Sequence, residues 1–455
     1  MKPLKKAHSL LIAVLVLAAC ASAGEAGRPV EVMDLAKADA RARAEAPAVL
    51  QAQAELAAAG HRARRGLAVG MPQVTGSASW TQRNETDVAV VGQASSRRRV
   101  GASLKAEQPL WTGGQLDAAR MEGRGSCGQA TAALAAARRD AALSARLAVL
   151  AAARTVDRLA ILKTAAADRR AEEAVVARLF TAGQADRLEQ SEAEVATMAA
   201  DEAAARARLE RERADRDLAI LLLLPLGSIT VTQSLATPGD GDAVAAQAQS
   251  HPGIDHERLR SAWVESLGQV QGARAQRMPT VSLRGEAGVA GGRIEQQWPV
   301  WSVGVEASWT IFSGFALEAA EAEAVARLAA ARRAVDDQER ERALSIQGLI
   351  ADRAALAVRL TAQQHLVERF AENHAAAVRL YSAGQVIFTR LRQAADQLVQ
   401  ARLLHLDLRH EDAGVFEKLR SASETLPASA SGTLPGSASE TLPRSPAKIG
   451  DGHGR

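Results

Sequence analysis

Two short stretches of the sequence decide the fold. They are Arg178-Leu-Phe-Thr-Ala-Gly-Gln184 and Arg379-Leu-Tyr-Ser-Ala-Gly-Gln385, which lie 201 residues apart. A second pair, Leu110-Trp-Thr-Gly-Gly114 and Ile311-Phe-Ser-Gly-Phe315, repeats at the same offset. Because the spacing from Gly113 to Gly183 is the same as that from Gly314 to Gly384, the sequence predicts a duplicated unit.

The interiors of the two copies are predicted to be long helices. The chain has 455 residues, of which 101 are alanine and only 3% are aromatic, and this composition is typical of closely packed helices. Each interior would form about 65 residues of helix, or about 100 Å at 1.5 Å per residue. A glycine at the far end then turns the chain back, so we expect helical hairpins over 115–224 and 316–420.

Apolar and polar residues alternate in a pair of segments just before each hairpin, over 73–110 and 280–312. In the second pair, Val303 and its apolar neighbours at every other position alternate with Ser302 and Glu306. This pattern predicts four strands with one apolar face, as in the wall of a membrane β-barrel or in a soluble sheet. Five tryptophans lie in or beside these strands and favour the barrel, since aromatic side chains gather at bilayer interfaces; they are Trp80, Trp111, Trp298, Trp301 and Trp309. Four strands cannot close a barrel, so several chains would share one.

The two ends of the chain are read as a targeting segment and a tail. Residues 1–23 combine a basic start with an apolar stretch too short to span a bilayer, which predicts an export signal. Leu17-Ala-Ala-Cys20 reads as a lipobox with Cys20 acylated, whereas Ala21-Ser-Ala23 would allow ordinary cleavage. Residues 421–455 repeat a Ser- and Pro-rich motif every eight residues and are expected to be disordered.

Nothing in the sequence indicates catalysis. The histidines lack the spacing of metal ligands and are read as isolated surface residues, and the two cysteines exclude a disulfide framework. The Gly123-Arg-Gly125 patch lacks the strand and helix context of a phosphate-binding loop. We therefore expect no enzyme activity, no metal, no cofactor and no nucleic-acid partner.

Residues 31–420 resemble the TolC family of outer-membrane efflux and secretion channels. The resemblance rests on the ordered landmarks Pro47, Pro72, Pro279, the Gln108-Pro-Leu-Trp-Thr-Gly-Gly114 exit and the two tip motifs. It implies an α+β membrane protein: a homotrimer sharing a 12-stranded outer-membrane β-barrel, four strands per chain, continued by a long periplasmic helical barrel. In that picture the first repeat covers 31–224, a loose equatorial linker 225–248 and the second repeat 249–420. The loops at 84–98 and 290–300 would face outside.

The resemblance also implies a function and partners. The chain would be the exit duct of a tripartite export machine in the outer membrane of a Gram-negative bacterium, with a large periplasmic part. Its partners would be a periplasmic adaptor, an inner-membrane pump or ABC transporter, and outer-membrane lipid. The cargo stays open between solutes and a protein of type I secretion. A periplasmic adaptor is the alternative function, but it would have one helical hairpin and no duplicated strands; a coiled-coil scaffold would need no strands flanked by tryptophan.

Two candidate sites lie at the helix turns. Arg178, Gly183, Arg379 and Gly384 form tips that would dock the adaptor, although the glycines alone are equally explained by a left-handed helix turn.

The family commonly carries an acidic residue six positions after each tip glycine. Glu189 holds that position in the first copy, but Arg390 holds it in the second. We expect these two residues to pair across the narrow end of the tunnel as an aperture gate. The alternative is that both are ordinary charges of the tunnel wall.

Overall fold

The computed structural model describes residues 31–82, 98–232, 234, 239–293 and 296–426. The predicted export signal with Cys20, most of the predicted loop 84–98, and the tail beyond residue 426 lie outside the described residues. The chain divides into two compact units. The first comprises residues 1–47, 140–243 and 348–421, and the second comprises residues 48–139, 244–347 and 422–455.

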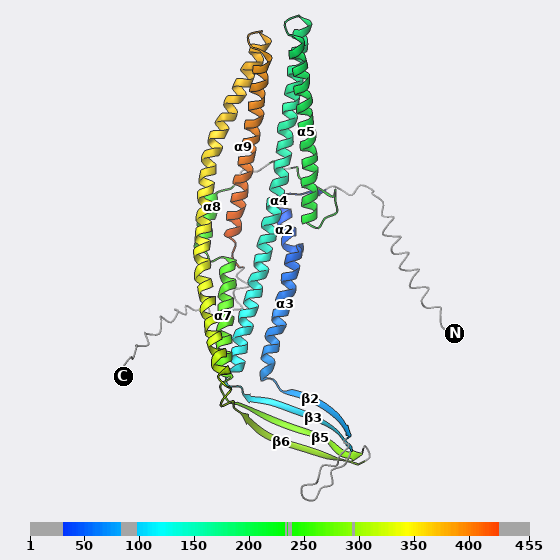
Figure 1. Cartoon of the computed structure of the whole chain (residues 1–455), viewed down its shortest axis with the longest axis vertical. Coiled ribbons are helices and arrows are strands. Elements are labelled where there is room, and N and C mark those ends of the chain that lie inside the picture. Colours follow the sequence, from blue (N-terminus) through cyan, green and yellow to red (C-terminus); the bar gives the residue numbers. More distant parts are fainter. Residues whose placement is uncertain (1–30, 83–97, 233, 235–238, 294–295, 427–455) are drawn as a thin grey trace, which may run out of the picture. The chain divides into compact units, whose positions relative to one another are not determined.

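The described elements are mostly helical (Figure 1). In chain order they are β1 Glu31–Val32, α2 Leu35–Glu45, α3 Pro47–Leu67, η1 Ala68–Gly70, β2 Gln73–Gln82, β3 Arg98–Trp111, α4 Gln115–Thr181, α5 Arg187–Leu221, β4 Ile229–Thr230, α6 Gly241–Ser250, α7 Ile254–Ala275, β5 Thr280–Arg293, β6 Gln296–Ser308, α8 Ala316–Ser382 and α9 Phe388–Ala422. Helices α4 and α8 have 67 residues each, and α5 and α9 have 35 each. Helices α8 and α9 begin and end at the same offset from α4 and α5 that separates the two tip motifs.

The first unit contains α5, nearly all of α9, and the parts of α4 and α8 that begin at residues 140 and 348. Small and branched apolar side chains fill its core, since alanine lets helices approach closely. One cluster joins α4, α5 and β4 to residues of α2 and α9, with Leu218 and Val231 fully buried. A second cluster packs Leu159, Leu162 and Ala207 against Leu403 of α9. The core thus ties the first hairpin to the second.

Two polar residues interrupt the apolar stripe of α8, and both are satisfied by α9. Gln363 is buried, and its amide donates a hydrogen bond to the backbone oxygen of Ala401 at 3.0 Å. The guanidinium of Arg353 pairs with Asp412 at 3.5 Å and lies over the ring of Phe416. Each polar side chain therefore meets a partner that offsets its desolvation.

The segment predicted as a loose linker contains regular structure. Strand β4 pairs with β1 in parallel, and Asp215 of α5 accepts hydrogen bonds from the Val231 N–H and the Thr230 hydroxyl, both at 3.2 Å. Helix α6 begins at Gly241, after Asp240 has accepted a bond from the Asp242 N–H at 3.0 Å. The prediction missed these elements because Gly and Pro outweigh the short apolar pattern there.

Glycines in the second unit let its helices cross at close range. A β-carbon on Gly125 of α4 would lie 2.5 Å from the backbone nitrogen of Glu265 in α7, and one on Gly268 would lie 2.7 Å from the nitrogen of Glu122. A β-carbon on Gly123 would lie 2.9 Å from the side chain of Ala63 in α3. Packing between helices therefore explains the glycine patch at 123–125.

The second unit also contains one four-stranded antiparallel sheet, with strand order β2-β3-β5-β6. Strands β2 and β6 are its edges, and among the described residues nothing pairs with their outer sides. The register aligns the alternating residues of all four strands, because residues opposite each other point to the same face. Val74, Ala106, Gly285 and Val303 form one such row.

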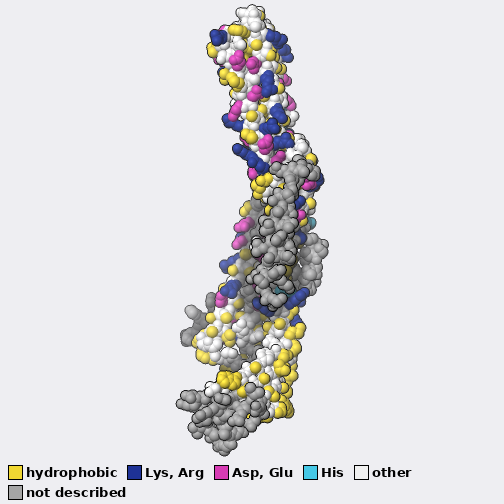
Figure 2. All heavy atoms as spheres, turned by 90° about the vertical axis from the view of Figure 1, so that its right-hand side faces the viewer, with side chains coloured by type: hydrophobic (Ala, Val, Ile, Leu, Met, Phe, Trp, Pro, Cys, Tyr) yellow, Lys and Arg dark blue, Asp and Glu magenta, His cyan; other side chains and the backbone are white. Residues whose placement is uncertain are grey.

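One face of the sheet is apolar and open to the surroundings. Val74, Trp80, Leu104, Trp301, Val303 and Val305 lie on it, each at least 62% exposed. In Figure 2 the described strands show largely hydrophobic side chains, whereas basic and acidic side chains are interspersed over the hairpins. We call this surface the apolar sheet face.

The opposite face of the sheet is polar and carries paired charges. Arg284 of β5 bridges Glu107 of β3 at 3.3 Å and also pairs with Glu306 of β6. Lys105 lies 3.9 Å from Glu286. These pairs join three neighbouring strands across the polar sheet face.

The predicted external loop 290–300 is wrong in extent. Strand β5 continues to Arg293 and β6 begins at Gln296, so only residues 294 and 295 separate them. Gly291-Gly292 and Pro299 suggested a loop, but their backbone pairs with the neighbouring strand, Gly291 with Gln297 and Val289 with Pro299. None of the described helices combines the length and the low charge that a membrane-crossing helix needs.

Candidate functional site: the ends of the hairpins

The two hairpin turns have the same backbone geometry. In the first, Gly183 has φ of 73°, and the Gln184 N–H donates to the Leu179 oxygen at 2.8 Å. In the second, Gly384 has φ of 71°, and the equivalent bond between Gln385 and Leu380 is 2.9 Å long. No atom lies within 4 Å of a β-carbon built on either glycine, so the left-handed backbone and not crowding requires glycine there.

The helices that follow the turns start differently. Asp186 caps α5 by accepting the Glu189 N–H at 2.7 Å. The equivalent residue of the second copy is Ile387, which has no side-chain acceptor. The Glu189 carboxylate of the first hairpin lies near the start of α9 instead and accepts the N–H of Phe388 at 3.4 Å. An acceptor from one hairpin thus serves the exposed helix end of the other.

Tyr381 strengthens this contact between the hairpins. Its hydroxyl donates to the second oxygen of Glu189 at 3.3 Å, and its ring packs edge to face against Phe388. Burial, and then the negative charge of Glu189, raises the pKa of Tyr381 to about 12, so the phenol keeps its proton at neutral pH. This stabilisation is fully present below about pH 10 and is lost as the pH rises toward 12.

Within the described part of the chain Glu189 and Arg390 do not pair, and the aperture gate stays a prediction. Glu189 is directed to Tyr381 and Phe388, and Arg390 is exposed on the first turn of α9. Arg178 and Arg379 also belong to the tips, and Arg178 donates to the Ala174 oxygen of its own helix at 3.3 Å. The structure therefore brings Glu189, but not the tip arginines or Arg390, into a contact between hairpins.

Apolar side chains complete the hairpin ends. Val176, Ala193, Ala377, Phe388 and Leu391 form a buried cluster with Tyr381, and Leu179 packs against it. Four other apolar side chains face outward with at least 38% exposure; they are Phe180, Leu188, Leu380 and Ile387. We call these four the tip apolar set.

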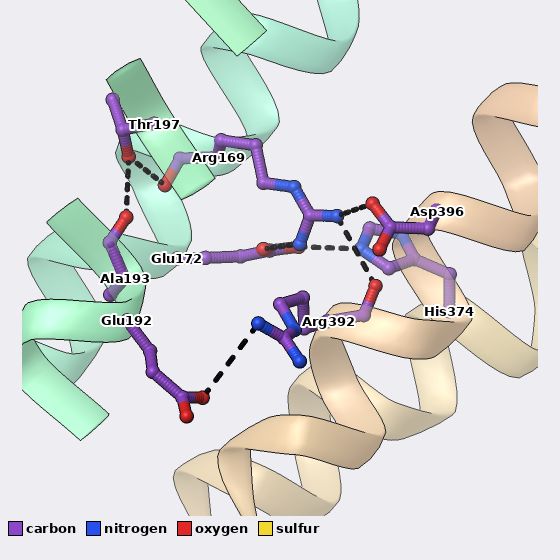
Figure 3. Close-up of polar contacts among 8 residues, drawn as sticks. All are labelled: Arg169, Glu172, Glu192, Ala193, Thr197, His374, Arg392 and Asp396. Carbon is purple, nitrogen blue, oxygen red and sulfur yellow. Dashed lines mark hydrogen bonds and ion pairs between the residues drawn. The ribbon is translucent and has the colours of Figure 1, made fainter. Parts of the chain in front are cut away.

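An ionic cluster with Arg169 and Glu172 buried at its centre joins the hairpins farther from the turns (Figure 3). Arg169 of α4 donates to Glu172 at 2.9 Å, to the backbone oxygen of Arg392 at 3.2 Å, and to the carboxylate of Asp396 in α9. The side chains of Arg169 and Glu172 are only 7% and 4% exposed. In this environment charges need partners, and Arg169 finds one on each hairpin.

The same cluster reaches α8 and α5. The second Glu172 oxygen lies 2.7 Å from Nε2 of His374, whose side chain is 14% exposed. Glu192 of α5 lies 4.0 Å from the guanidinium of Arg392. Four helices therefore contribute to one network, which we call the inter-hairpin cluster (Figure 3).

Sequence reasoning missed this cluster. His374 was interpreted as an isolated surface histidine, which is wrong, because it is mostly buried and bonded to Glu172. Arg169 and Glu172 lie one turn apart on a helix, and oppositely charged pairs with this spacing usually lie on the solvent-exposed face of a helix. Their partners on α8 and α9 belong to the other copy of the repeat. The one feature of the sequence that could have indicated these contacts is the occurrence of polar residues within a helix stripe that is otherwise apolar. Among the described residues no three His, Cys, Asp or Glu side chains are placed to hold a metal ion.

The model of the family described as outer membrane efflux protein matches residues 259–423, which include the second strand pair and the second hairpin. This match covers less than half of the chain. The resemblance to TolC-family channels is thereby confirmed over these residues, which are similar to a family of outer-membrane efflux proteins.

Solved structures have the same fold over most of this chain. The outer membrane protein VceC of Vibrio cholerae has a TM-score of 0.76 at 17% identity, over 86% of this chain and 97% of that chain. The CmeC outer membrane channel of Campylobacter jejuni has 0.70 at 15% identity, over 88% of each chain. The open-state MtrE outer membrane channel of Neisseria gonorrhoeae has 0.69 at 18% identity, over 86% and 89%. No protein of curated function gives a significant sequence match.

Proposed function

We propose that this chain is the exit duct of a tripartite export machine and that three copies share one 12-stranded β-barrel. The observation that carries the proposal is the sheet, which has one apolar face and, among the described residues, two edge strands without partners. Open edges in lipid would leave backbone groups unpaired, so neighbouring copies must supply the missing strands. The apolar sheet face would contact lipid, and the polar sheet face would line the water-filled pore.

Further parts of the proposal concern partners and processing. A duplicated unit is supported by the constant offset between the hairpins, whose helices begin at Gln115 and Arg187 in the first copy and at Ala316 and Phe388 in the second. The hairpins would continue the pore into the periplasm. A periplasmic adaptor linked to an inner-membrane pump would contact the hairpin tips. Residues 1–23 would direct export, with Cys20 as the acylation site.

The assembly is tested by separating the membranes of cells that produce the protein. We expect the outer-membrane fraction to contain a trimer that migrates as one band without heating and as the single chain after boiling. A chain found as a monomer in the periplasmic fraction would contradict the duct and favour the adaptor alternative.

The assigned faces predict a large difference between neighbouring positions of β6. Val303→Arg places a charge on the apolar sheet face and should cost roughly 2–4 kcal/mol if it lies near the bilayer midplane. Ser302→Arg places the same charge on the polar sheet face, beside water, and should be tolerated. The measurement is the yield of heat-modifiable trimer, and equal yields of the two variants would contradict the assigned faces.

Adaptor docking is tested at the tip apolar set. Leu179 packs inward, so we choose Phe180 and Leu380, which are 38% and 40% exposed. Phe180→Asp with Leu380→Asp should lower crosslinking to the adaptor about tenfold, which corresponds to about 1.4 kcal/mol. Replacing both residues with Met keeps the surface apolar and should retain crosslinking. If the Asp variant crosslinks as well as the Met variant, the tips are turns without a docking role.

A further inference from the structure

A group of exposed aromatic side chains follows strand β6. Phe312 is 73% exposed and Phe315 is 70% exposed, in the segment between β6 and α8. Their rings meet edge to face, with centroids 5.6 Å apart and planes at 86°. Ile311 beside them is 82% exposed. Three large apolar side chains thus stand together without cover from the described part of the chain.

Phe315 adopts a backbone conformation that disfavours side chains. Its φ is 66°, in the left-handed region, and the equivalent residue of the first copy is Gly114, with φ of 97°. Glycine takes such angles freely, whereas a phenylalanine there raises the free energy of the folded chain. The first junction therefore uses the residue that the backbone favours, and the second uses a strained one. The phenyl ring is largely exposed and meets only the similarly exposed ring of Phe312 among the described aromatic contacts, so little burial within the described chain offsets this strain.

The exposed group continues the apolar sheet face. That face runs along β6 through Val303 and Val305, and Trp309 follows directly after the strand. The indole N–H of Trp309 donates to the backbone oxygen of Arg277 at 3.0 Å, while its ring is 60% exposed. An indole with its polar end satisfied and its apolar ring uncovered suits the boundary between headgroups and acyl chains.

We propose that Phe312 and Phe315 are a lipid-contacting clasp, seated in the headgroup and acyl boundary of the bilayer at the helical end of the sheet. This inference rests on the proposed function, because it requires the apolar sheet face to lie in lipid. Burial of both rings in the boundary would offset the backbone strain at Phe315. The first junction, with Gly114 at the equivalent position, has no ring there.

The test introduces the photo-crosslinking residue benzoylphenylalanine into the full-length chain, in cells whose phospholipids are radiolabelled. Position 315 should form a labelled lipid adduct after illumination. Leu223 is a matched control, since it is also exposed and has φ of 54°, but it belongs to the first unit, which does not contain the four-stranded sheet, and it should form none. An adduct of position 315 with a second copy of the chain or with another protein, without lipid, would overturn the clasp.

Position 303 separates failure of the clasp from failure of the proposed function. Labelling at 303 but not at 315 leaves the apolar sheet face in lipid and eliminates the clasp. Labelling at neither position eliminates the membrane-embedded sheet as well.

A second measurement uses the backbone strain at Phe315, because relief of strain and loss of lipid contact change the ease of urea extraction in opposite directions. Phe315→Gly and Leu223→Gly both relieve the backbone strain of a residue in the left-handed region. If relief of strain were the whole effect, both variants would resist urea extraction from membranes at least as well as the unmodified protein. The clasp predicts that Phe315→Gly is extracted about tenfold more readily than the unmodified protein, while Leu223→Gly is not. Equal or lower extraction of Phe315→Gly would contradict a lipid contact.

Discussion

Arg169→Met is expected to lower the free energy of unfolding by about 3–5 kcal/mol, because it removes one member of a buried ionic network. Glu172, which is 4% exposed, would lose its guanidinium partner and keep only His374. Asp396 would lose its tie to the first hairpin. The measurement is the unfolding of the purified protein by denaturant, with the free energy of unfolding obtained from a two-state fit of the transition.

The next residue along α4 is the matched control. Arg170 is 62% exposed and pairs at 2.5 Å with Asp201, which is 42% exposed, so Arg170→Met should cost about 0–1 kcal/mol. The inter-hairpin cluster also predicts a functional difference. Loss of the link between α4 and α9 should raise single-channel conductance for Arg169→Met but not for Arg170→Met. Equal stability losses in the two variants would contradict the role of burial.

Gly125→Ala is expected to destabilise the protein by about 1–3 kcal/mol, the range for overpacking a tight contact. The added methyl group would meet the backbone of Glu265 at 2.5 Å, and backbone cannot rotate away as a flexible side chain can. Helices α4 and α7 would have to separate. The loss is measured as the shift in unfolding midpoint and in the yield of trimer.

The same substitution at Gly60 should change the stability of the protein in the opposite direction. Gly60 lies within α3, and no atom lies within 4 Å of a β-carbon built there. Alanine has the better helix propensity, so Gly60→Ala should stabilise the protein by up to about 1 kcal/mol. Destabilisation by both substitutions to the same degree would show that helix crossing is not what requires Gly125.

Local patterns were sufficient for much of the fold. The hairpins follow from long segments nearly free of Gly and Pro, and the tip glycines from the backbone angle that a tight helix end requires. Strict alternation placed Val303 and Ser302 on opposite faces, because the side-chain period of a strand is two. The loop at 290–300 was overestimated because glycine and proline signal turns but also occur in paired strands.

The candidate site was harder to predict, since its contacts join residues distant in sequence. Glu189 was identified by position, but its partners were not, because Tyr381 and Phe388 reach it only when the two hairpins pack together. His374 meets Glu172 for the same reason. A charged residue within an apolar helix stripe indicates a buried partner without indicating which one.

Modification of single cysteines in β6 tests the central claim most directly. The purified protein, carrying Cys127→Ser to remove the described free thiol, is inserted into a planar bilayer and treated with a charged, membrane-impermeant thiol reagent. For Ser302→Cys we predict a stepwise fall in single-channel conductance, because the proposed barrel places this side chain in the pore. For Val303→Cys we predict no change, because the proposed barrel places that side chain against lipid. A block of Val303→Cys with no effect on Ser302→Cys, or the absence of channels from the unmodified protein, would contradict the account.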